Sequence, residues 1–228
     1  MNVTYYGHSC FLCEIGAYRV IFDPFITPNP LAAGVNIDDL DVDFILLSHG
    51  HADHIHDVER IALRTRAPVV APYETGEYLR RRGLENVLTA NPGGRLRLPF
   101  GTVRLVAALH SNSLPDGRYG GVAVGFVIET PEQTIYYSGD TALTQEMKTL
   151  AEVYPRGITA AFLPLGGQYT MDVADALIAS RWCGAQRVVG MHFNTFALLE
   201  IDCAAARAQA AAAGVELLLP AVEQKFTL

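Results

Sequence analysis

The sequence lacks any apolar segment long enough to cross a membrane, and its amino terminus lacks the features of a secretory signal. No stretch of about 18 uncharged apolar residues occurs anywhere in the chain. The chain opens with the residues MNVTYY, which contain neither a basic segment nor an apolar run. We therefore expect a cytoplasmic protein without a membrane partner.

Positive charge is also scarce, and no linker divides the chain. The 228 residues include 17 Lys+Arg against 24 Asp+Glu, which gives a net charge of −7. Non-specific nucleic-acid binding depends on a basic surface, so nucleic acid is not an expected partner. A chain of this length can bury one large core, and we expect a single domain over residues 1–228.

Cysteine is the next scarce residue, with four in the chain: Cys10, Cys13, Cys183 and Cys203. Cys10 and Cys13 lie in a strand-like run, where their odd separation places them on opposite faces. A redox pair of the thioredoxin type lies instead at the start of a helix. We expect free thiols, as is typical of a reducing compartment.

Histidine, in contrast, is concentrated in the stretch DFILLSHGHADHI. Its apolar part, residues 44–48, has the composition of a strand buried on both faces. Four potential ligands follow at once: His49, His51, Asp53 and His54. Imidazole and carboxylate groups bind divalent ions such as zinc. A merely polar loop is a weaker explanation, because crowded histidines repel one another when protonated.

Three more expected strands end on a potential ligand. His110 follows a strand over 101–109, Asp140 follows one over 133–138, and His192 ends one over 187–191. A lone histidine beyond a strand is more often structural than functional. Four strand ends that all finish on His or Asp nevertheless predict a site along one rim of the fold.

The order of the expected elements predicts an α+β fold with two sheets packed face to face and helices outside. Strands over 2–6, 9–15 and 18–22 have tight connections, which favour an antiparallel meander. The other expected strands are 68–71, 101–109, 122–129, 133–138, 158–165, 187–191 and 215–219. The expected helices are 55–66, 74–82, 142–153, 171–182 and 201–213.

Together these motifs resemble those of a known superfamily. The ordered set SHGHADH from Ser48, then His110, then SGDT from Ser138, then His192 resembles the ligand set of the metallo-β-lactamase superfamily. The segments GHSCF, LPLGGQYTMD and MHFNTF are similar to those of small metal-dependent hydrolases close to L-ascorbate-6-phosphate lactonase. The resemblance implies a four-layer αββα sandwich with two divalent ions at its edge.

Matched position by position, the resemblance divides the ligands between two ions. It assigns His49, His51 and His110 to the first ion and Asp53, His54 and His192 to the second, with Asp140 bridging both. Zinc is the expected metal, and manganese, iron and nickel accept the same donors. The implied reaction is attack by a metal-bound hydroxide on a small ester, lactone or phosphodiester. The net positive charge of such a site favours an anionic substrate or intermediate.

Further roles are expected near the ligands. Asp53 could also orient the nucleophile. His8 either protonates a leaving group or binds a phosphoryl or carboxylate oxygen, or it has the structural role of capping a turn. Asp57 is expected to orient a ligand imidazole through its other nitrogen. His56, where similar sequences have glycine, is expected to point away from the ions.

Three loops are expected to contact the substrate. Arg118 could pair with an anion through its guanidinium group, although an exposed turn residue is an equal alternative. The other residues of these loops with expected substrate contacts are Gln168, Tyr169 and Asn194.

Other functions remain open at this point. A nuclease of the same superfamily is the hydrolytic alternative, although the acidic charge disfavours it. A diiron redox protein is less expected, because such relatives usually carry glutamate where this chain has His51, and no flavin domain is present. A non-catalytic metal-binding protein is the third class, since ligands alone do not prove turnover. The sequence also leaves open whether the chain forms a homo-oligomer.

Overall fold

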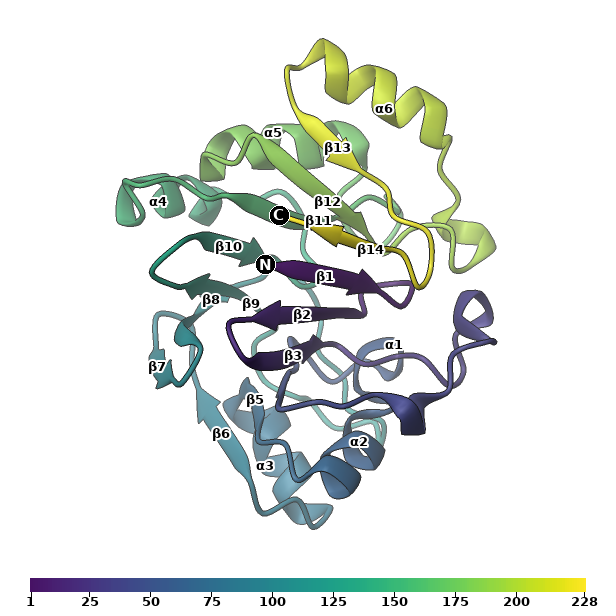
Figure 1. Ribbon diagram of the computed structural model, residues 1–228, viewed down its shortest axis with the longest axis vertical. Helices are drawn as coiled ribbons and strands as arrows, with labels where there is room; N and C mark the ends of the chain where they lie inside the picture. The colour runs from purple at the N-terminus through teal and green to yellow at the C-terminus, as the bar shows by residue number, and fades with distance from the viewer.

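The computed structural model describes residues 1–228 and contains two seven-stranded sheets (Figure 1). The first sheet has the order β14-β1-β2-β3-β4-β5-β6, and the second has the order β13-β12-β11-β10-β9-β8-β7. The strands of the first sheet are β1 (Asn2–Tyr5), β2 (Phe11–Ile15), β3 (Tyr18–Phe22), β4 (Phe44–Leu46), β5 (Val69–Pro72), β6 (Val87–Ala90) and β14 (Lys225–Thr227). Those of the second are β7 (Arg95–Leu98), β8 (Gly101–Ala107), β9 (Val124–Glu129), β10 (Thr134–Tyr137), β11 (Ala160–Pro164), β12 (Arg187–Met191) and β13 (Glu216–Leu218).

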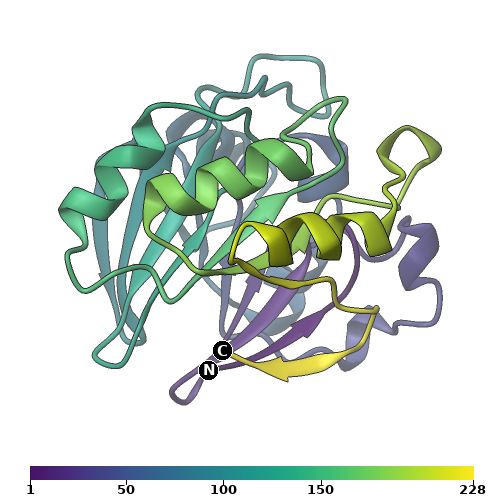
Figure 2. The same ribbon diagram turned by 90° about the horizontal axis from the view of Figure 1, so that it is seen from above.

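Helices cover the outer face of each sheet (Figure 2). They are α1 (Ala52–Ile55), α2 (Val58–Thr65), α3 (Tyr73–Arg81), α4 (Glu146–Val153), α5 (Val173–Cys183) and α6 (Cys203–Ala212). Apolar residues of α2 and α3 pack on the first sheet, and those of α4 and α5 pack on the second. The αββα sandwich predicted from the sequence is therefore confirmed. None of the helices is both long enough and apolar enough to cross a membrane.

The core between the sheets follows from the period-two alternation of the strands. In β2, Phe11, Cys13 and Ile15 point into this core, where Phe11 packs edge-on against Phe162 of β11. Cys10 lies on the opposite face, among the residues under the helices, so the predicted separation of the two cysteines is confirmed. All four cysteines are free thiols.

Some predicted elements were wrong in extent. The single helix expected over 55–66 is divided into α1 and α2, and His54 belongs to α1 rather than to the loop before a helix. Three short strands were not predicted: β6, β7 and β14. All three lie at the edge of a sheet, where a strand is short and half exposed, so its apolar signal is weak.

One rim of the sandwich gathers the ends of several strands. Strands β3, β4 and β5 run parallel in the first sheet, as do β10, β11, β12 and β13 in the second. Parallel neighbours end at the same edge of a sheet. The residues that follow β3, β4, β10 and β12 are therefore brought to common edges.

Candidate metal centre

Four of the predicted ligands, His49, His110, Asp140 and His192, lie one to three residues beyond a strand, while Asp53 and His54 lie in α1. Ser48 and His49 follow β4, and His110 follows β8. Asp140 follows β10 through Gly139, whose φ is +59° and where an added Cβ would lie 2.5 Å from the Val124 carbonyl oxygen. Only glycine fits this turn without strain. The turn thereby places the Asp140 carboxylate at the rim.

Backbone strain is concentrated around the same rim. Four non-glycine residues at or beside the cluster have positive φ: His8 at 55°, Asp23 at 40°, His192 at 53° and Asn194 at 56°. Such conformations cost free energy and persist where the surrounding structure enforces them, most often at functional sites. The fold therefore holds this rim in a conformation that an ordinary loop would avoid.

The first group of ligands consists of His49, His51 and His110. One donor atom from each lies within 4.8 Å of the others. His49 Nε2 is 3.0 Å from His51 Nδ1, while His49 Nδ1 is 2.9 Å from Ser48 Oγ. The serine thus fixes the ring so that Nε2 points toward the other two imidazoles. Three converging imidazole nitrogens are a set that suits zinc.

The second group consists of Asp53, His54 and His192, with His8 beside them, and its donor atoms also lie within 4.8 Å of one another. Asp140 lies between the two groups. Its Oδ2 is 2.9 Å from His192 Nε2, 3.3 Å from His54 Nε2 and 3.6 Å from His110 Nε2. A carboxylate that reaches nitrogens of both groups has the placement that a bridging ligand requires.

The donor atoms fit a divalent cation. His54 Nε2 and Asp140 Oδ1 are buried, and neither has a hydrogen-bond partner in the protein. Buried polar atoms are nearly always paired, so two unpaired atoms in one cluster call for a ligand that the protein does not itself supply. Imidazole nitrogen and carboxylate oxygen are both natural donors to a divalent ion.

The buried carboxylates of the cluster also favour positive charge beside them. Burial acts to raise the pKa of Asp140, but His192 and His54 outweigh it and hold that pKa well below its usual range. Burial, with the neighbouring His54, lowers the pKa of His49. Burial acts to lower the pKa of His54 too, but Asp140 and Asp23 raise it. An ionised Asp140 and a neutral His49 are the states that metal binding needs, whereas an ion at His54 would replace the proton that the two carboxylates stabilise there.

Asp23 is the main residue that the sequence analysis missed. It is fully buried, and its Oδ2 accepts hydrogen bonds from Ser48 Oγ at 2.6 Å and Tyr137 OH at 2.7 Å. The same oxygen lies 2.8 Å from Nδ1 of His54, a predicted ligand. Asp23 therefore orients His54 through its other ring nitrogen. The signal was present, since Asp23 follows β3 directly, just as Asp140 follows closely after β10.

The role predicted for Asp57 was wrong. Its Oδ2 accepts hydrogen bonds from the backbone amides of Ile26 and Thr27, at 2.7 and 2.8 Å, so it anchors the loop after β3. Its only histidine partner is His56, whose Nδ1 is 3.2 Å from Oδ1. His56 is half exposed and points away from the cluster, as predicted.

His8 does not cap the turn in which it lies. Its side chain is fully buried, with Nε2 3.0 Å from Asp53 Oδ2 and Nδ1 2.9 Å from Thr195 Oγ1. Burial and the neighbouring His192 lower the pKa of His8 to about 4, so the ring is neutral at pH 7. A neutral ring between these partners can donate to the Asp53 carboxylate through Nε2 and accept from Thr195 through Nδ1.

A cavity of about 510 Å³ opens onto the cluster. The side of its wall that faces the cluster comprises the predicted ligands His51, Asp53, His110, Asp140 and His192. Ser111 and four bulkier side chains complete the wall: Tyr169, Phe196, Leu198 and Leu199. No lysine or arginine lines it. The cavity therefore combines a polar floor with largely apolar sides.

Of the four residues predicted to contact substrate, Tyr169 alone lines this cavity. Arg118 lies outside it, exposed and paired with Asp116. Asn194 Oδ1 accepts a hydrogen bond from the Ile201 amide at 2.8 Å, so that side chain stabilises its own loop. Gln168 is exposed and is not part of the wall.

Comparisons with known proteins point to one family. The family model described as a beta-lactamase superfamily domain matches residues 18–193. A protein of Methylacidiphilum infernorum named UPF0173 metal-dependent hydrolase is 47% identical over 202 residues, which cover 89% of this chain and 88% of that one. One of the same name from Flavobacterium johnsoniae is 42% identical over the full length of both chains.

Solved structures share the fold over the whole chain. A metallo hydrolase from the archaeon Ignicoccus hospitalis is 32% identical, with a TM-score of 0.88 and coverage of 100% of this chain and 98% of that one. An isothiocyanate hydrolase from Delia radicum gut bacteria is 20% identical with a TM-score of 0.80, covering 100% and 99%. At that lower identity the likeness concerns the fold alone.

Proposed function

Because the chain belongs to the metallo-β-lactamase superfamily and is a metal-dependent hydrolase, we propose that it hydrolyses a small ester or lactone at a dinuclear metal site. The composition of the cavity wall is the observation that supports this substrate class. It offers apolar side chains and no lysine or arginine. Beyond the proposed ions, no side chain of this wall would neutralise the charge of a phosphodiester, so a neutral carbonyl substrate suits the cavity better.

The predicted ligand sets remain our assignment for the two ions. His49, His51 and His110 would hold one ion, and Asp53, His54 and His192 the other, with Asp140 shared. When bound, such ions polarise a carbonyl oxygen and activate water. The favourable field that the sequence predicted for an anionic partner would then act on the oxyanion that develops during hydrolysis.

We propose that His8 positions Asp53 rather than exchanging a proton with substrate. His8 is fully buried and does not line the cavity, so it has no path to a leaving group. Its contacts with Asp53 and Thr195, at 3.0 and 2.9 Å, fix one carboxylate oxygen. The other oxygen of Asp53 is left to the metal or to the attacking water.

Replacing His8 by alanine should weaken metal binding or lower kcat by about 10- to 100-fold, the usual effect of removing a group that orients a ligand. His8→Gln should recover part of this loss, because a glutamine amide can donate to Asp53. Metal affinity measured by competition with a chelator, together with kcat, checks the prediction. Equal losses in both variants, or metal affinity and kcat unchanged in His8→Ala, would contradict the positioning role.

The apolar wall predicts how activity depends on substrate length. Each methylene that is buried contributes about 0.8 kcal/mol, so kcat/KM should rise by about fourfold per methylene along a short series of acyl esters. Leu198→Ser should flatten this slope, since Leu198 lines the cavity. Leu63→Ser is the matched control, because Leu63 is similarly exposed, at 65% against 57%, but lies on α2 outside the cavity. A slope that Leu198→Ser leaves unchanged would contradict the assignment of the wall.

The proposed function is tested by a turnover panel of esters, lactones, phosphodiesters, thioesters and short RNAs. Each is offered to protein loaded with zinc, manganese or iron, whose content is measured by elemental analysis. We expect about two ions per chain and the fastest turnover with an ester or lactone. Preference for RNA would favour the nuclease alternative, and metal binding without any turnover would favour a metal-binding protein.

A further inference from the structure

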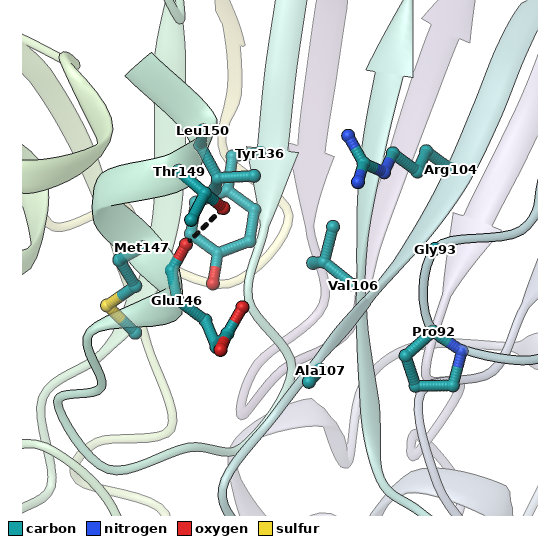
Figure 3. Close-up of a pocket in the computed structure, with 10 residues that line it drawn as sticks. All are labelled: Pro92, Gly93, Arg104, Val106, Ala107, Tyr136, Glu146, Met147, Thr149 and Leu150. Atoms are coloured by element: carbon teal, nitrogen blue, oxygen red, sulfur yellow. Dashed lines mark hydrogen bonds between the residues drawn. The ribbon is translucent and has the colours of Figure 1, made fainter. Parts of the chain in front are cut away.

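A second cavity, of about 230 Å³, lies on the outer face of the second sheet between β8 and α4 (Figure 3). Its charged side chains are Arg104, from β8, and Glu146, the first residue of α4. Apolar side chains complete the wall, among them Val106, Met147 and Leu150. None of its lining residues belongs to the cavity over the metal cluster, so the two are separate.

Arg104 has no partner in the protein. Val103 and Leu105 point into the core between the sheets, so Arg104 points to the opposite, helix-covered face. Its Nε and Nη1 atoms are buried without a hydrogen-bond acceptor, and the guanidinium forms no ion pair. Arg104 is partly buried, and its two buried donors cost free energy while they lack an acceptor.

Further positive charge surrounds Arg104. Arg95 lies directly opposite it in the antiparallel pair of β7 and β8, and therefore on the same face. Arg97, two residues along β7, shares that face. Like charges directly opposite one another destabilise a sheet. A bound anion would offset this repulsion and would supply the partner that Arg104 lacks.

The other residues of the cavity wall indicate which class of anion could bind. Figure 3 shows Glu146 across the cavity from Arg104, and its carboxylate forms no ion pair with any residue. A ligand in this cavity therefore faces one cation and one anion. Because Glu146 offsets the attraction of Arg104, a second negative charge on the ligand gains little here, and a monoanion is enough to pair with Arg104. The apolar residues Val106, Met147 and Leu150 offer contacts to an aliphatic stem.

We propose that this cavity binds a small aliphatic monocarboxylate, with its carboxylate on the Arg104 guanidinium and its stem against Val106 and Leu150. A guanidinium fork and a carboxylate form paired, charge-assisted hydrogen bonds, which is the geometry that an unpartnered arginine can supply. Access is through the outer face of the sheet. Binding here neither uses the metal ligands nor depends on the reaction at the metal centre.

The test follows the guanidinium itself in the metal-loaded protein. Butyrate is titrated while the arginine side-chain ¹⁵Nε–H signals are recorded, and Arg104→Lys identifies the Arg104 signal by its loss. We expect that signal to shift and saturate with butyrate, and to stay in place with butyramide, the neutral isostere. Butyrate that binds only the metal ions would leave the Arg104 signal unmoved, and that result would overturn the proposal.

Two variants separate recognition by Arg104 from general attraction to the basic face. Arg104→Gln should weaken butyrate binding at this cavity at least tenfold by titration calorimetry on protein whose metal sites are first saturated with a chelating inhibitor. Arg97→Gln, which removes an exposed charge on the same face but outside the cavity, should change it little. Equal losses in the two variants, a shift with butyramide as large as with butyrate, or tighter binding of inorganic phosphate would each overturn the proposed class. If Arg104→Gln fails to fold, the titrations of the unaltered protein still decide between these outcomes.

Discussion

Asp140→Asn should lower kcat/KM by about 10³-fold, because in the proposed dinuclear site this carboxylate is shared between two ions and contributes several kcal/mol to holding them. Asparagine has nearly the same shape, so packing at this buried position is preserved. It has one acceptor oxygen and no charge, however, and cannot span two ions. In the unaltered protein, Oδ2 of Asp140 lies within 3.6 Å of the Nε2 atoms of His54, His110 and His192. The substitution weakens all three contacts at once.

Metal content by elemental analysis and kcat/KM on the best ester of the panel measure this effect together. We expect Asp140→Asn to retain fewer than two ions per chain as its activity falls. Asp116→Asn is the matched control, since Asp116 pairs with Arg118 at the surface and outside the cavity. That variant should keep both its metal content and its activity. An Asp140→Asn protein with two tightly held ions would show that Asp140 is not the bridging ligand.

Most of the cluster was predictable because its residues follow strands. His49, His110, Asp140 and His192 each come directly or closely after an apolar run, and the ends of such runs can be recognised from the sequence. Asp23 follows the same rule but was not recognised. An isolated aspartate before a proline is typical of a turn, and only the folded chain shows that its carboxylate faces His54.

The cavity walls were less predictable, for a physical reason. Side chains in a strand alternate between two faces, whereas in a loop their direction is set by whatever partner lies nearby. Arg118 bonds to Asp116, two residues before it, and so turns away from the site. Phe196 and Leu198 face the cavity because of the 3₁₀ turn over Ala197–Leu199. No hydrophobic periodicity in the sequence predicts this turn.

The clustering of positive charge around Arg104 was equally unpredictable from the sequence. The alternation in Arg95–Leu98 indicates a strand, with leucines facing the core between the sheets and arginines on the other face. The sequence does not say which strand lies beside it. The register that sets Arg95 opposite Arg104 comes from the short hairpin between β7 and β8, which only the three-dimensional structure defines.

Asp23→Asn should destabilise the protein by about 3–5 kcal/mol, because it removes one partner from a buried, charged network. The amide nitrogen would meet the donors Ser48 Oγ, Tyr137 OH and His54 Nδ1 where a carboxylate oxygen now accepts. We also expect metal affinity to fall by about 10- to 100-fold, since His54 loses the group that orients its ring. Denaturant unfolding of metal-free protein measures the first effect, and chelator competition measures the second.

Asp57→Asn separates these two effects. Asp57 is as deeply buried as Asp23 and also accepts backbone hydrogen bonds, from Ile26 and Thr27, but it has no contact with a proposed ligand. Its substitution should lower the free energy of unfolding by about 1–3 kcal/mol, as the loss of buried hydrogen bonds does, and leave metal affinity nearly unchanged. If both variants weaken metal binding equally, Asp23 acts only by stabilising the rim. If Asp23→Asn alone weakens it, the carboxylate of Asp23 sets the orientation in which His54 meets the metal.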